Sequence, residues 1–90
     1  MLDITDRTVV ITGGATGIGF GLAKAFGTRG ANVVIGELRQ ARLDEAVATL
    51  NDSGIKARAM PLDVTDPKQL SDFAEQAFAA FGEVAVVINN

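Results

Sequence analysis

Apolar residues along this chain follow two alternating patterns. Short runs of β-branched and aliphatic residues, such as Thr8-Val9-Val10-Ile11, are typical of parallel strands that are buried on both faces. Between these runs, apolar residues recur every three or four positions, which is the spacing of one helix face. The patterns predict strands over 8–11, 32–36, 56–62 and 84–88, alternating with helices over 17–29, 39–50 and 67–81.

Residues that flank the predicted helices support their boundaries. Gly30 follows the first helix as a stop signal, and the polar segment 51–54 ends the second. Asp66 is expected to cap the third helix, with Pro67 at its first position and Gln69 closing back on the cap. The expected apolar faces comprise Ile18, Leu22, Ala25 and Phe26 in the first helix, Leu43, Ala46, Val47 and Leu50 in the second, and Leu70, Phe73, Ala74, Ala77, Phe78 and Phe81 in the third.

The strict alternation of strand and helix with short connections predicts an α/β fold. Such a chain forms a parallel sheet with right-handed crossovers, which place helices against its faces. Pro61 within the third apolar run favours a position near the end of that strand or at the edge of the sheet. Ninety residues suffice for one domain.

A glycine-rich segment joins the first strand to the first helix. Gly13 would let the chain leave the strand sharply, Gly17 would let a pyrophosphate approach the backbone, and Gly19 would let the helix pack close to the strand. Backbone N–H groups at the start of a helix, where the helix dipole is positive, can receive a phosphate. Glycines that only punctuate a turn are the alternative, but the flanking strand and helix favour binding of a dinucleotide phosphate.

Glu37 lies at the end of the second predicted strand, 24 residues after Gly13 and 18 after Gly19. An acidic residue at this place can accept hydrogen bonds from the hydroxyls of an adenosine ribose, and its charge would repel a 2′-phosphate. The alternative is a solvated loop carboxylate, the usual fate of Glu. The position favours a ribose contact and therefore NAD over NADP.

Three segments carry a resemblance to a known family. T-G-G-A-T-G-I-G at 12–19, L-D-V-T-D at 62–66 and V-V-I-N-N at 86–90 together resemble the N-terminal part of classical short-chain dehydrogenases/reductases. The resemblance implies a partial doubly wound, Rossmann-like parallel sheet of order 3-2-1-4, with a switch point between strands 1 and 4. It also implies that 1–90 is the dinucleotide-binding portion of a single domain of roughly 250 residues, truncated after strand 4.

The resemblance further implies which residues contact the cofactor. Asp63-Val64 is similar to the family's adenine-recognition pair, although an Asp that ends a strand before a capped turn is the alternative. Asn89 matches a motif residue beside the adenine ribose, and Thr12 matches one that braces the turn against the fourth strand. The cofactor-binding set expected from position and resemblance together comprises Gly13, Thr16, Gly17, Ile18, Gly19, Glu37, Leu38, Asp63, Val64 and Asn89.

NAD is the expected cofactor, and NADP is less favoured. Members of the family that prefer NADP commonly carry Arg or Lys just before the second motif glycine or just after strand 2, where this sequence has Thr16, Glu37 and Leu38. Arg39 is the nearest cation that could reach a 2′-phosphate. The glycine spacing also differs from the T-G-x-x-G-x-x-G of extended-type epimerases and dehydratases.

The resemblance implies an oxidoreductase that transfers hydride between a nicotinamide cofactor and an alcohol or carbonyl compound. The family's chemistry uses a Tyr-x-x-x-Lys pair, and this sequence has no Tyr, so we expect no catalytic residue here and no activity of the chain alone. A non-catalytic nucleotide-binding module is the alternative function.

Composition narrows the range of partners. The chain has no Cys and no His, which argues against a metal site of the usual zinc type. Its net charge is −3, and it has no cluster of basic residues that could bind nucleic acid. No apolar run is long enough for a membrane span, so we expect a cytoplasmic protein. The uncharged fourth strand would leave an exposed edge, which predicts a homo-oligomer or association through that edge.

Overall fold

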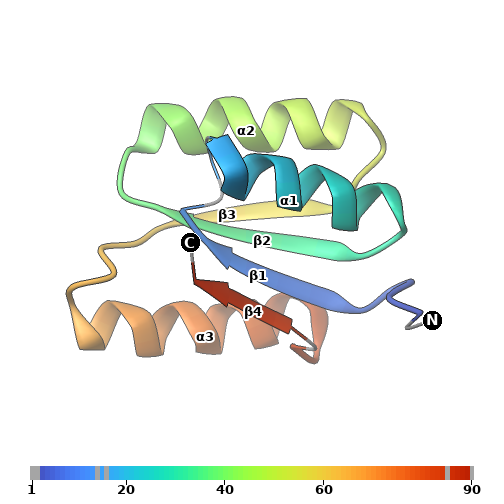
Figure 1. The fold of residues 1–90 in the computed structure, drawn as a ribbon. Helices are drawn as coiled ribbons and strands as arrows, with labels where there is room; N and C mark the ends of the chain where they lie inside the picture. Colours follow the sequence, from blue (N-terminus) through green and yellow to red (C-terminus); the bar gives the residue numbers. More distant parts are fainter. Residues whose placement is uncertain (1–2, 14, 16, 85, 90) are drawn as a thin grey trace.

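The computed structural model describes residues 3–13, 15, 17–84 and 86–89, and within them strands and helices alternate along the chain (Figure 1). This order confirms the predicted alternation, with boundaries that shift by one to two residues. The elements are β1 (Thr8–Thr12), α1 (Gly17–Thr28), β2 (Asn32–Glu37), α2 (Gln40–Asp52), β3 (Ala57–Pro61), α3 (Pro67–Phe81) and β4 (Val86–Asn89).

The four strands form one parallel sheet in the order β3-β2-β1-β4. This confirms the order 3-2-1-4 and places the strand with Pro61 at an edge. Helices α1 and α2 cover one face and α3 covers the other, as in a doubly wound sheet (Figure 1). Because the strands are parallel, the turn after β1 and the segments after β2 and β3 all lie at the carboxyl edge of the sheet.

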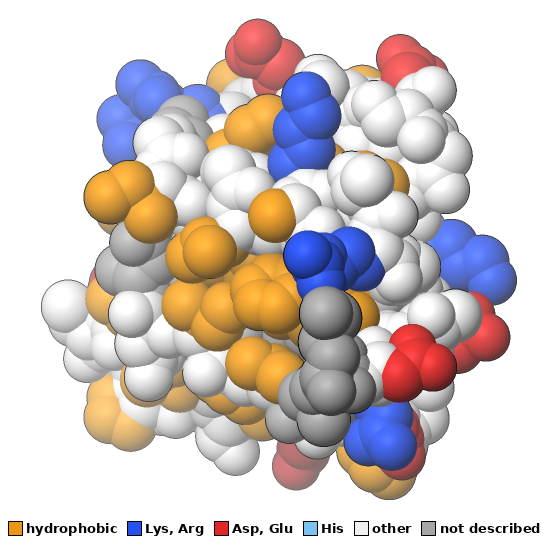
Figure 2. All heavy atoms as spheres, turned by 45° about the vertical axis from the view of Figure 1, so that its right-hand side comes forward, with side chains coloured by type: hydrophobic (Ala, Val, Ile, Leu, Met, Phe, Trp, Pro, Cys, Tyr) orange, Lys and Arg blue, Asp and Glu red, His pale blue; other side chains and the backbone are white. Residues whose placement is uncertain are grey.

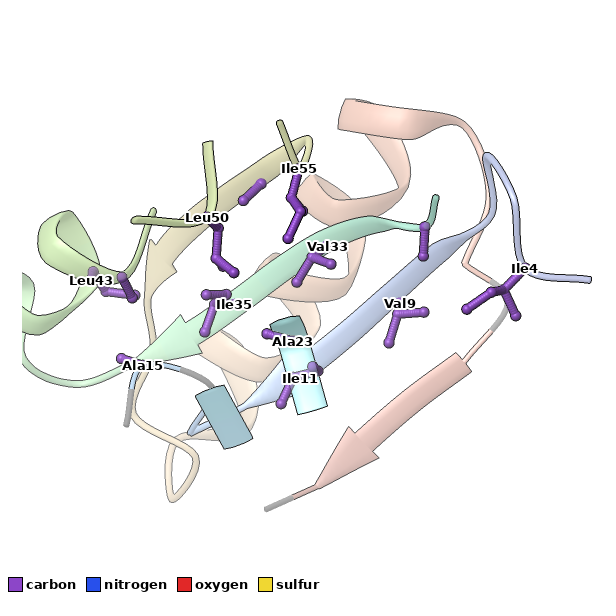
Figure 3. Packing of buried hydrophobic residues seen from close by; sticks show 13 residues of the cluster. Ile4, Val9, Ile11, Ala15, Ala23, Val33, Ile35, Leu43, Leu50 and Ile55 are labelled. Atoms are coloured by element: carbon purple, nitrogen blue, oxygen red, sulfur yellow. The ribbon is translucent and has the colours of Figure 1, made fainter. Parts of the chain in front are cut away.

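The two faces of the sheet bury alternate residues of β1 and β2, as the two-residue period of a strand requires. Val9, Ile11, Val33 and Ile35 pack with α1 and α2, and Figure 3 shows them on the side where Ala23, Leu43 and Leu50 lie. On the opposite face, Val10 and Val34 pack with Leu62, Phe73 and Ala77. Both central strands are buried on both faces, so the core of the domain lies on either side of β1 and β2.

The prediction of which residues form the buried face of α1 is partly wrong. Gly19, Ala23 and Gly27 are its buried residues, whereas Ile18 is 76% exposed and Ala25 is also exposed. The helix lies close to its neighbours, and a Cβ atom on Gly27 would approach Ile55 Cδ1 to 2.9 Å. Small residues therefore take the inner face, because larger side chains would not fit between the helix and the core.

The apolar stripe of α3 is also narrower than expected. Phe73 and Ala77 are buried, while Leu70, Ala74 and Phe78 are exposed. A single helix covers this face, so side chains directed away from the sheet meet no second layer. Figure 2 shows hydrophobic side chains gathered in the middle of one face of the molecule, with charged side chains above and to the right of them.

In the part of the chain that the structure describes, no helix combines the length and apolar character needed to cross a bilayer.

Candidate functional site

The turn between β1 and α1 requires glycine at two positions. Gly13 and Gly17 have φ angles of +67° and +60°, a region that residues with a Cβ atom rarely adopt. The Gly13 N–H donates to the Gly36 carbonyl over 2.7 Å, which extends the pairing of β1 with β2 into the turn. A Cβ on Gly17 would meet open space, so its backbone conformation is the reason for glycine there.

Helix α1 begins at Gly17, directly after this turn. The first N–H groups of a helix have no carbonyl partner within it, and the helix dipole makes this end positive. Gly19 is buried beneath the turn, and Ile18 projects from it with most of its side chain exposed. The backbone here can therefore accept an anionic group from solvent.

The tips of three strands meet beside the turn. Thr12 pairs with Gly36 of β2 on one side and with Asn89 of β4 on the other. The Thr12 hydroxyl donates to the Ile88 carbonyl over 3.5 Å, which confirms the expected bracing of the turn against β4. The crossovers on the two sides of β1 lie on opposite faces of the sheet, because α1 links β1 to β2 on one face and α3 leads to β4 on the other (Figure 1). Ligands of open α/β sheets bind at such a switch point.

A cavity of about 330 Å³ opens between the ends of β2 and β3. It brings together five of the residues expected to bind a cofactor, although they come from three separate segments of the chain. Leu38 and Val64 both present largely exposed apolar side chains there. The lining comprises Gly13, Gly36, Glu37, Leu38, Leu62, Asp63, Val64 and Thr65.

The other expected residues that the structure describes do not line this cavity. Gly17 lines a second cavity of about 580 Å³ between α1 and α2, which also includes Arg42 and Glu45. Ile18 and Gly19 belong to the first turn of α1, and Asn89 is exposed at the end of β4. Thr16 lies outside the described residues, so its expected contact has no structural description.

Glu37 forms an ion pair that the sequence did not predict. Its Oε1 lies 3.5 Å from Arg39 Nε, and only 12% of the Glu37 side chain is exposed, against 61% for Arg39. The carboxylate is therefore held at the rim of the cavity by the cation that had been the nearest candidate for a 2′-phosphate. Glu37 ends β2 and Arg39 lies in the connection that follows, and such a pair carries no periodic signal, so the pairing required the folded geometry.

Asp63 accepts two hydrogen bonds from Thr65, at 3.0 Å from the backbone N–H and 2.7 Å from the hydroxyl. Both fall on Oδ1. These bonds, the hydroxyl's first, hold the pKa of Asp63 below its usual value, so the carboxylate is ionised at neutral pH. An Asp two residues before a Thr is a known turn signal that could have identified Thr65 from the sequence.

The start of α3 has the expected arrangement with one additional contact. Asp66 accepts from the backbone N–H groups of Lys68 and Gln69, which confirms it as the cap. Gln69 closes back on the cap as expected, because its Nε2 donates to Asp66 Oδ2 over 3.2 Å, and its Oε1 makes an additional contact by accepting from the Asp63 N–H. Within the described residues, no group of three or more His, Cys, Asp or Glu side chains is arranged to hold a metal ion.

Comparison with known proteins adds independent evidence. Residues 7–90 match the family model of the short chain dehydrogenases. The chain is 39% identical over 90 residues to a C alpha-dehydrogenase from a Sphingobium species, covering all of this chain and 30% of that protein. It is 36% identical over 91 residues to an L-rhamnose 1-dehydrogenase (NADP(+)) from Thermoplasma acidophilum, covering all of this chain and 36% of that protein.

A solved structure shows the same arrangement of elements. A short chain dehydrogenase/reductase from Burkholderia phymatum in complex with NAD superimposes with a TM-score of 0.93 at 28% identity, covering 97% of this chain and 31% of that one. The chain thus spans about a third of the length of the relatives it matches. The match of the family model over nearly the whole chain, together with these relatives, shows that the chain belongs to the short chain dehydrogenase family.

Proposed function

We propose that this chain binds the adenosine diphosphate half of NAD. The observation that carries the proposal is the cavity at the ends of β2 and β3, where Glu37, Leu38, Asp63 and Val64 converge beside the glycine turn. In the proposed arrangement the pyrophosphate meets the N–H groups at the start of α1, and the adenosine occupies the cavity. The family membership and the NAD-bound structural neighbour support it.

The side chains of the cavity suit the parts of an adenosine. The Glu37 carboxylate would accept hydrogen bonds from the ribose hydroxyls. Leu38 and Val64, which are 66% and 53% exposed, offer apolar surface to the faces of the base. Asp63 is ionised, and its Oδ2 accepts from no donor among the described residues. This oxygen would accept a hydrogen bond from the amino group of adenine. The remaining expected contacts, from Gly13, Thr16, Gly17, Ile18, Gly19 and Asn89, surround the diphosphate and the ribose in this proposal.

We propose NAD as the preferred cofactor. A 2′-phosphate would lie near the Glu37 carboxylate, and two anions repel each other at close range. Arg39 partly compensates this charge through its ion pair, so the expected preference is moderate. One relative, by its name, uses NADP. The choice of cofactor therefore depends on this local charge balance rather than on the fold.

We propose that the hydride transfer of the family, between a nicotinamide and an alcohol or carbonyl compound, needs residues that this sequence does not contain. It has no Tyr, so the Tyr-x-x-x-Lys pair that serves as general acid/base in the family is not in these 90 residues. The chain's own role is then to bind and orient the cofactor, and we expect the 90 residues alone to show no dehydrogenase activity.

Calorimetric titration with ADP-ribose, NAD and NADP tests the proposal. We expect ADP-ribose to bind about as tightly as NAD, because no described residue is assigned to the nicotinamide. Glu37→Arg should strengthen NADP and weaken NAD binding, since it replaces repulsion of the 2′-phosphate by attraction. Glu75→Arg makes the same change of charge at an exposed position of α3 and should leave both affinities unchanged.

Two results would contradict the proposal. Absence of ADP-ribose binding to the unmodified chain would remove the assigned site altogether. Much tighter binding of NAD than of ADP-ribose would show that this chain contributes a nicotinamide pocket, contrary to the assignment.

We further propose that the chain associates through β4, either with a second copy or with further strands. Val86–Asn89 carries no charge and no proline, and among the described strands it pairs only with β1. The opposite edge is better protected, because Pro61 has no N–H and the Ala57 N–H donates to Asn51 Oδ1. A cytoplasmic location is proposed as well, since a chain without cysteine needs no oxidising compartment to fold.

A further inference from the structure

Gln69, in the first turn of α3, connects two structural features through its side-chain amide. Its Oε1 accepts from the backbone N–H of Asp63 over 2.9 Å, and its Nε2 donates to Asp66 Oδ2 over 3.2 Å. The amide therefore uses its acceptor toward the end of β3 and its donor toward the helix cap. A glutamine is one of few side chains that can make both bonds at once, because they require opposite hydrogen-bonding roles.

Hydrogen bonds within the segment from Asp63 to Asp66 form a turn. The Asp66 N–H donates to the Asp63 carbonyl over 3.1 Å, and Asp63 Oδ1 accepts from Thr65. Asp66 Oδ1 in turn accepts from the N–H groups of Lys68 and Gln69. The turn over residues 63–66 is thus tied at one end to the start of α3, and Gln69 is the side chain that ties its other end to the same helix.

This turn forms one wall of the cavity at the ends of β2 and β3. The Leu62 N–H donates to the Glu37 carbonyl over 2.9 Å, and this bond continues the pairing of β2 and β3 beyond Pro61. Asp63, Val64 and Thr65 follow immediately and line the cavity opposite Glu37 and Leu38. Their position therefore depends on contacts to α3 rather than on the regular hydrogen bonding of the sheet.

We propose that Gln69 is a positioning residue for ligand recognition, which acts by holding Asp63 and Val64 toward the cavity. The inference rests on the proposed function, because Asp63 is taken to accept from the 6-amino group of the base. Gln69 itself lies outside the cavity lining and makes no contact with the ligand in this arrangement. Its loss frees the Asp63 amide and lets the carboxylate move away from the base, so discrimination between purines weakens.

The test compares two ligands that differ only at the recognised group. ADP-ribose carries a 6-amino group, and the analogue whose base is unsubstituted purine carries hydrogen there, which cannot donate a hydrogen bond to Asp63. We expect Gln69→Ala to weaken ADP-ribose binding about threefold to tenfold, the range of one net hydrogen bond, and to change the affinity for the unsubstituted purine compound much less. Gln76→Ala, the same substitution at an exposed position of α3, should change neither.

A second measurement needs no ligand. Hydrogen exchange of the Asp63 amide, followed by NMR, should accelerate in Gln69→Ala and remain as in the unmodified chain in Gln76→Ala. If Gln69→Ala does not fold, Gln69→Ser, whose hydroxyl is too short to reach Asp63, takes its place in both measurements.

The outcomes separate this inference from the proposed function. Binding of ADP-ribose by the unmodified chain with the same purine selectivity in Gln69→Ala overturns the positioning role and leaves the binding site standing. An equal loss of affinity for both compounds also overturns it, because that pattern indicates general destabilisation. Failure of the unmodified chain to bind ADP-ribose would remove both.

Discussion

Two glycines of α1 allow a matched test of how tightly this helix is packed. Gly21 and Gly27 lie on the same helix, and neither has a positive φ angle. A Cβ atom on Gly21 would meet nothing within 4 Å, whereas one on Gly27 would approach Ile55 Cδ1 to 2.9 Å and Cγ1 to 3.0 Å, with Cγ2 closer still. Gly21→Ala and Gly27→Ala should therefore have opposite effects on stability.

The expected magnitudes follow from two opposing contributions. Replacing glycine by alanine inside a helix stabilises by about 0.5–1 kcal/mol, because alanine loses less backbone entropy on folding. At Gly27 the added methyl group must displace Ile55, which is buried in the core, and such overpacking costs about 1–3 kcal/mol. Gly21→Ala should raise the free energy of unfolding. The free energy of unfolding of Gly27→Ala should be about 1–3 kcal/mol lower than that of Gly21→Ala.

Urea denaturation monitored by circular dichroism measures this difference. The two midpoints should separate while the slope with urea stays the same, because both variants expose the same surface on unfolding. Ile55→Ala should cost less stability in the Gly27→Ala background than in the unmodified chain, since it removes the clashing atoms. Equal stability of the two glycine variants would refute the close approach and, with it, the explanation of why α1 buries its small residues.

Two further predictions concern the turn after β3 and the β4 edge. Thr65→Val removes the hydroxyl that contributes most to the low pKa of Asp63, so this pKa should rise toward its usual value of 3.8. Ionised Asp63 stabilises the fold above pH 3.8, and this stabilisation is lost as the pH falls through the lower pKa of the folded state. Thr65→Val should therefore reduce this stabilisation. NMR titration measures the pKa of Asp63, and an unchanged pKa in Thr65→Val would contradict the prediction. Asp3 should keep its pKa in the same spectra. Val87→Lys on β4 should reduce self-association in sedimentation experiments relative to Ala48→Lys on α2, and equal association of both variants would exclude the β4 edge.

Much of the architecture followed from local patterns in the sequence. The alternation of β-branched runs with helical spacing identified every strand and helix, because each pattern depends on residues that are close along the chain. The parallel sheet followed from the strand and helix alternation, and the strand order followed from the family resemblance. Gly13 and Gly17 adopt positive φ angles in the turn after β1. The preference for glycine at such angles depends only on the residue's own backbone conformation, so it too can be read from the local sequence.

Contacts between distant segments could not be obtained in this way. Periodicity assigned Ile18 to the inner face of α1, whereas Gly19, Ala23 and Gly27 are the residues buried there. At Gly27 even a Cβ atom would approach Ile55 too closely. The pairing of Glu37 with Arg39 and the bond from Gln69 to the Asp63 amide depend on side-chain directions at the ends of three different elements. Hydrophobic pattern reports which residues avoid water, but packing distances and hydrogen-bond partners are set only when the elements meet in the folded chain.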